Sequence, residues 1–135
     1  VWGDPDRGFV GRPDGGGPAG GYGVYERPVA ALARRHGARP AGLRGARPAD
    51  VYAELLAGRP VMTWIGLSDG PYRQWRTLEG RRVTGNFGEH TVVLTGLRGD
   101  RLAVNDPLDG RRKTWTKGQF ELMWRRLGSR ALTLR

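Results

Sequence analysis

Cysteine is absent from the 135 residues, and the only two histidines are His36 and His90. The lack of cysteine excludes disulfides, zinc–thiolate sites and iron–sulfur clusters, and it excludes a cysteine nucleophile from this chain. With two histidines, a metal site would need carboxylate ligands, and no group of acidic residues has the spacing of such a site. We therefore expect no metal and no cofactor.

Long apolar runs are absent as well. No stretch of about 18 apolar residues is present to span a membrane, and no pattern of a secretory signal peptide opens the chain. The first residue is Val1 rather than Met, and a segment rich in Gly, Asp and Pro follows. We therefore expect a processed or excised part of a longer protein.

Acidic residues are outnumbered, 13 against 23 basic ones, for a net charge of +10. Such a charge is typical of proteins with an anionic partner such as nucleic acid. The cations are nearly all arginine, scattered singly and in pairs, and accompany abundant Gly, Ala and Pro. These residue types share GC-rich codons, so composition explains the charge better than selection for nucleic acid does.

The length predicts one domain over residues 1–135. Residues 1–24 are too rich in Gly and Pro for a helix or a central strand and predict a long loop. Helices are predicted from Glu26 to His36 and from Arg47 to just before Gly58, because apolar residues recur at helical spacing. His36 lies at the end of the first helix, where a solvated side chain is expected rather than a ligand.

Strands dominate the rest of the chain. Pro60–Leu67, His90–Leu97 and Arg101–Asp106 are the strongest candidates. Weaker strands are predicted at 72–75 and 82–84, a helix at 117–127 with Thr116 as N-cap, and a last strand at 130–134. The order predicts an α+β fold with an antiparallel sheet. Trp64, Trp75 and Trp124 are assigned to the core or to the wall of a cleft.

His90 and Asp106 lie at the two far ends of a predicted hairpin. A three-residue connection, Arg98–Asp100, would place Val92 opposite Asp106 and put the two side chains on one face as diagonal neighbours. A two-residue turn at Gly99–Asp100 would shift the register by one and put them on opposite faces. A histidine beside an aspartate is the base-and-acid pair of a catalytic triad, whereas a polar strand end followed by a turn is the plainer interpretation.

Several segments resemble, in order and over nearly the whole chain, the later part of bacterial C-thirty-nine-like peptidase domains. These domains are papain-like cysteine peptidases related to the enzymes that process bacteriocin leaders. The most specific segment is HTVVLTGLRGDRLAVNDPLDG, which starts at His90. The others are GDPDRGFVG, GYGVYERPVAALARRHG, GRPVMTWI and FELMWRRLGSRAL.

The resemblance implies a papain-like fold, incomplete here, with N-terminal helices and an antiparallel sheet. It also implies a Cys-His-Asp triad in which His90 is the general base and Asp106 the orienting acid. The family's cysteine, and the glutamine before it, match no residue of this chain, so we expect both in a missing N-terminal segment. Trp115 then either screens the pair from water or belongs to the core.

The leading hypothesis is the His-and-Asp part of a cysteine peptidase that acts on peptides or proteins. We expect it outside a bacterial cell or in its envelope. One alternative is a catalytically inactive peptide-binding module of the same fold. Another, disfavoured above, is an arginine-rich domain that binds nucleic acid. The substrate-binding residues are not predicted.

Overall fold

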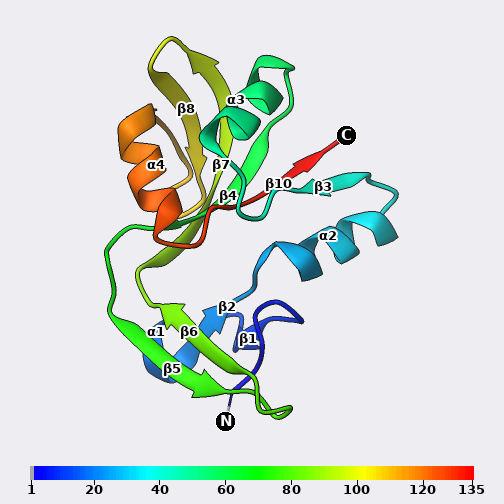
Figure 1. The fold of residues 1–135 in the computed structure, drawn as a ribbon, viewed down its shortest axis with the longest axis vertical. Helices are drawn as coiled ribbons and strands as arrows, with labels where there is room; N and C mark the ends of the chain where they lie inside the picture. Colours follow the sequence, from blue (N-terminus) through cyan, green and yellow to red (C-terminus); the bar gives the residue numbers. More distant parts are fainter. Residues whose placement is uncertain (1) are drawn as a thin grey trace.

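A six-stranded antiparallel sheet forms the larger part of the molecule in the computed structural model, which describes residues 2–135 (Figure 1). Its strand order is β3-β10-β4-β7-β8-β9. The bounds are β3 (Pro40–Gly42), β4 (Val61–Gly66), β7 (Glu89–Arg98), β8 (Arg101–Asp106), β9 (Arg111–Thr116) and β10 (Arg130–Leu134). The strongest predicted strands thus lie side by side in the interior of the sheet.

Two helices pack against one face of this sheet: α3 (Pro48–Leu56) and α4 (Lys117–Arg125). The predicted cap of α4 is confirmed, because Thr116 Oγ1 accepts from the Gln119 amide at 3.1 Å. The side chains of this first core come from both helices and from alternate positions of the strands. They include Val51, Leu55, Ile65, Val92, Leu94, Leu102, Val104, Phe120 and Trp124.

A second core lies on the opposite face, where α2 (Glu26–Arg35) packs. Trp64 and Leu132 reach it from β4 and β10, because neighbouring positions of a strand point to opposite faces. Ala30 of α2 and Leu127 contact the same cluster. The sheet therefore separates two cores.

A smaller group of elements extends from this second face (Figure 1). It contains the hairpin of β5 (Tyr72–Arg76) and β6 (Arg82–Asn86), the short pair β1 (Val10–Gly11) and β2 (Gly21–Gly23), and α1 (Gly17–Gly20). Its centre is a cluster of ring contacts between Trp2, Tyr22, Trp75 and Phe87.

The fold differs from the sequence-based prediction in the short elements near the N-terminus and in the two edge strands of the large sheet. The predicted loop over residues 1–24 contains β1, α1 and β2, and Trp75 Nε1 fixes it by donating to the Gly3 carbonyl at 2.7 Å. The edge strands β3 and β9 were not predicted. Edge strands carry fewer buried side chains, so β3 and β9 have fewer of the apolar and β-branched residues that mark β4 and β7. The α+β class and the antiparallel sheet are confirmed.

Candidate functional site

His90 and Asp106 meet at one end of the central hairpin of β7 and β8. His90 Nε2 lies 2.6 Å from Asp106 Oδ1. The aspartate side chain is 3% exposed and the histidine 15%, so the carboxylate is buried beneath a ring that still reaches solvent. The structure therefore brings together the two residues that the sequence singled out.

The register that joins them arises differently from the sequence-based expectation. The turn is the two-residue one, since Arg98 pairs with Arg101 across Gly99 and Asp100. By itself this turn would put His90 and Asp106 on opposite faces. The pairing shifts by one between Leu94 and Gly96, and beyond this point Val93 pairs with Asn105. Of the two connections considered from the sequence, the three-residue one is not formed.

Thr95 is the extra residue at this shift, which makes it a β-bulge. A bulge inserts one residue into one strand, so every side chain beyond it changes face relative to the partner strand. Thr95 Oγ1 donates to the Ala103 carbonyl at 3.4 Å on the neighbouring strand. The bulge thus restores the arrangement in which His90 and Asp106 share a face.

Asp106 is held on both carboxylate oxygens. Oδ1 also accepts from the Leu108 backbone amide at 2.9 Å, and Oδ2 lies 2.7 Å from Lys113 Nζ. The Lys113 ammonium group, together with the hydrogen bond from His90, holds the pKa of Asp106 far below its usual value even though burial opposes this. Asp106 is therefore a carboxylate at neutral pH.

An ionised Asp106 determines which proton the imidazole of His90 keeps. A carboxylate has no proton to give, so Nε2 donates and carries the ring proton. In the neutral ring, Nδ1 is then left with a free lone pair. The pair can accept a proton at Nδ1 while the buried carboxylate stabilises the resulting imidazolium.

Lys113 was missed by sequence reasoning. It lies on β9, where it pairs with Val104 of β8, so its side chain reaches the end of the hairpin that holds Asp106. Asp109 Oδ2 contacts the same ammonium at 3.2 Å. The signal was present in Asp109–Gly110, a dipeptide typical of hairpin turns, which predicts a further strand immediately after it.

The turn before His90 is fixed by the buried side chain of Asn86. Asn86 Oδ1 accepts from the amides of Gly88, at 2.8 Å, and Gly70, at 3.2 Å. Asn86 Nδ2 donates to the Ser68 carbonyl at 3.0 Å. A Cβ at Gly88 would lie 2.1 Å from Ser68 Oγ, so only glycine fits there. These contacts fix the turn between β6 and β7, which leads into His90.

The tryptophans and His36 lie largely as predicted. Trp64 and Trp124 are buried in the two cores, and Trp75 is buried in the aromatic cluster of the smaller group. Trp115 is partly buried against the first core and also lines a cavity of about 470 Å³ beside Asp106 and Lys113. His36 is the exposed C-cap of α2.

Several arginines form ion pairs with acidic residues of the same chain. Five of them pair with buried carboxylates: Arg44, Arg59, Arg81, Arg130 and Arg135. Arg130, for example, lies 2.9 Å from both Asp6 and Glu26. Part of the cationic excess is therefore structural, which weakens the argument from charge to a nucleic-acid partner.

Within residues 2–135, no group of three or more His, Asp or Glu side chains is arranged to hold a metal ion. No helix in this described range has the length and apolar character that crossing a membrane requires.

A buried carboxylate under a histidine, placed at the start of an interior strand of an antiparallel sheet, is the arrangement expected of the papain-like class. The model of the Peptidase_C39 like family matches residues 1–132, and the chain belongs to this family. The resemblance noted in the sequence is thus confirmed.

Two proteins illustrate how far the similarity extends. The chain is 32% identical over 136 residues to the uncharacterized protein YvpB of Bacillus subtilis (strain 168), covering 98% of the chain and 53% of the relative. It therefore spans about half the length of this curated relative. A crystal structure of a candidate C39-like peptidase from Bacillus anthracis superposes with a TM-score of 0.83 at 29% identity. That match covers 98% of the chain and 69% of the solved one.

Proposed function

We propose that this chain supplies the general base and the orienting acid of a cysteine peptidase. His90 is the base, Asp106 is the acid, and the thiol comes from a residue outside these 135, which contain no cysteine. The observation that carries the proposal is the 2.6 Å contact between His90 Nε2 and a buried, ionised Asp106. Membership of a peptidase-like family supports it.

The proposed reaction starts with transfer of the thiol proton to His90 Nδ1, which gives a thiolate and an imidazolium. The thiolate sulfur attacks the carbonyl carbon of a peptide bond, and His90 donates the proton to the departing amine as the carbon–nitrogen bond breaks. His90 then takes a proton from water, whose oxygen attacks the thioester. The acid product leaves, and the sulfur is reprotonated. Asp106 holds the ring throughout.

The test uses the protein that carries both this chain and the thiol. His90→Ala should reduce peptide hydrolysis by at least 10³-fold, because removing one member of a triad has effects of about this size. His36→Ala is the matched control, since His36 is the other histidine of the chain and lies exposed at the end of α2. Equal loss in both variants, or retained hydrolysis in His90→Ala, contradicts the base assignment.

A second candidate, an inactive peptide-binding module of the same fold, is favoured by one observation: the absence of cysteine from the 135 residues. It predicts peptide binding without turnover. Absence of hydrolysis and of labelling by thiol-directed reagents in the same natural protein would support this candidate over the peptidase.

A further inference from the structure

Glu89, the residue before His90, is half-buried and differs from the acidic residues whose side chains are the most buried, because each of those faces a cation. Their side chains are 3–8% exposed, and all take part in ion pairs: Asp4, Asp6, Glu26, Glu54 and Asp106. Glu89 has no hydrogen-bond or ion-pair partner within the described residues, although the chain has 23 cationic side chains to offer.

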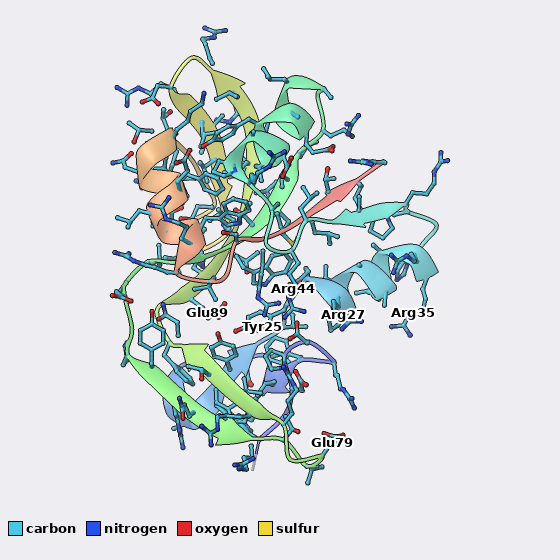
Figure 2. All side chains as sticks on the ribbon, viewed as in Figure 1. Tyr25, Arg27, Arg35, Arg44, Glu79 and Glu89 are labelled. Carbon is cyan, nitrogen blue, oxygen red and sulfur yellow. The ribbon has the colours of Figure 1, made fainter. Side chains whose placement is uncertain are left out.

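The Glu89 carboxyl borders a cavity instead. The cavity measures about 370 Å³ and opens between β7 and the smaller group of elements. In Figure 2, Glu89 lies where β7 meets the smaller group of elements, and Tyr25 lies near it. Besides Glu89, its walls include Phe9, Tyr22, Phe87 and Thr91. This volume falls within the range of pockets that bind small ligands or single side chains.

Glycines leave open space in front of the Glu89 carboxyl. Gly15, Gly16, Gly17, Gly21 and Gly23 line the cavity. At Gly23 the backbone has a φ of +122°, and an added Cβ would lie 3.3 Å from Glu89 Oε1. A side chain at this position would therefore be strained and would crowd the carboxyl. Glycine here keeps the carboxyl accessible from the cavity.

The chemistry of these walls suits an organic cation. An ionised carboxylate without a partner attracts an ammonium or guanidinium group strongly when water is partly excluded. The rings of Tyr22 and Phe87 add faces that favour a cation, and they also pack against its aliphatic stem. Burial raises the pKa of Glu89 to about 7, and a cationic ligand would offset this cost of ionisation.

We propose that this cavity binds the cationic side chain of a peptide, lysine or arginine. Glu89 and His90 are consecutive residues of β7, so their Cα atoms lie about 3.8 Å apart. Because neighbouring side chains of a strand point to opposite faces, the cavity and the His–Asp pair lie on the two faces of one strand end. A peptide crossing this end would reach both. The use of the cavity as a substrate subsite rests on the proposed function, whereas cation binding itself does not.

The experiment titrates the ¹⁵N-labelled chain at pH 8 with three blocked amino acids. These are the N-acetyl N-methylamides of lysine and arginine and, as a neutral analogue of similar shape, of norleucine. The cationic compounds should shift the amide resonances of Gly21, Gly23 and Thr91, and norleucine should not. The lysine and arginine arms show whether the cavity prefers an ammonium or a guanidinium.

Glu89→Gln should weaken binding of the cations at least tenfold, because it removes the charge and keeps the shape. Glu79→Gln, at an exposed carboxylate in the β5–β6 turn, should leave binding unchanged. Thermal unfolding establishes that both variants are folded. Equal binding of norleucine, shifts centred on other residues, or an unchanged affinity in Glu89→Gln would overturn the inference. Since the titration requires no thiol and no hydrolysis, its failure leaves the peptidase proposal standing.

Discussion

Lys113 Nζ lies 2.7 Å from Asp106 Oδ2, the oxygen that His90 leaves free. The carboxylate is therefore shared between the ammonium group of Lys113 and the imidazole of His90. Both contacts lower the pKa of Asp106 and keep its carboxyl ionised.

Lys113→Met should raise the pKa of Asp106, because it removes the largest influence that lowers it. A carboxyl whose pKa is lowered by folding contributes stability above its unfolded value of 3.8, and this contribution is lost as the pH falls through the folded value. The variant should therefore unfold in acid at a higher pH than the parent. Carbon-13 titration of the carboxyl measures the first effect, and circular dichroism against pH the second.

Lys117→Met provides the control, since Lys117 is the other lysine of the chain and packs over the ring of Tyr52. If the midpoint pH of acid unfolding moves equally in both variants, the loss of any lysine charge has this effect. The specific role of the contact with Asp106 would then be contradicted.

Deleting Thr95 should leave His90 and Asp106 in contact. Without the bulged residue, Leu94 and Gly96 become neighbours and keep their present partners Val104 and Ala103, so the hairpin turns into a regular one. We expect a folded protein with reduced stability. The His90 Nε2 proton, hydrogen-bonded to a buried carboxylate, should remain observable by NMR.

Deleting Val93 is the matched comparison two residues away. It leaves the bulge in place but inverts the faces of the residues before it, which turns His90 away from Asp106 and Val92 out of the core. The Nε2 proton signal should disappear and the protein should be strongly destabilised. If both deletions behave alike, the assignment of Thr95 as the surplus residue is wrong.

Glu89→Gln should stabilise the fold at pH 8 and leave stability nearly unchanged at pH 4. Folding raises the pKa of Glu89 from 4.5 to about 7, so the charged form is disfavoured in the native state. The resulting penalty is absent below 4.5, grows between the two values and is complete above the upper one. We expect a gain on the order of 2 kcal/mol at pH 8, after allowing for screening by solvent.

Urea unfolding at the two pH values measures this difference. Tyr22 and Tyr25 interact electrostatically with Glu89, and burial raises the pKa values of both, so neither tyrosine titrates in this range. A gain of equal size at pH 4 and pH 8 would show that ionisation of Glu89 is not its source.

Asn86→Ala should destabilise the protein by about 2–4 kcal/mol, because the buried amides of Gly70 and Gly88 lose their acceptor. The same change loosens the turn that leads into His90, so hydrolysis in the thiol-bearing protein should fall more than stability accounts for. Thr84→Ala, at an exposed position of the same strand β6, should cost far less. Comparable losses in the two variants would contradict the role of Asn86.

Much of the site was accessible from the sequence, but its register was not. The apolar and β-branched residues of His90–Leu97 and of Arg101–Asp106 predict two neighbouring strands, and their ends predict a contact of His90 with Asp106 under one register. The bulge at Thr95 has only a weak local signature, because a glycine inside a strand, here Gly96, often marks a bulge but does not fix which residue is extra. The position of the bulge depends on which side chains of β7 are buried in the cores, and this is a property of the tertiary structure.

Lys113 and Glu89 depend on tertiary placement in the same way. β9 is a polar edge strand, and its lysine becomes informative only once it lies beside Asp106. That Glu89 lacks a partner is likewise invisible in a chain with an excess of arginine, because any carboxylate could be expected to find one. Elements with strong periodicity are predictable, whereas contacts between distant edges are not.

The order of strands in the sheet has a consequence for how the molecule assembles during synthesis. β10 lies between β3 and β4, although it is made after both. Until residues 130–134 leave the ribosome, β3 has no neighbour in the sheet and one side of β4 presents open backbone groups to other chains. The residues of the hairpin that unites His90 with Asp106 are made earlier, so these two side chains can meet before the sheet is complete.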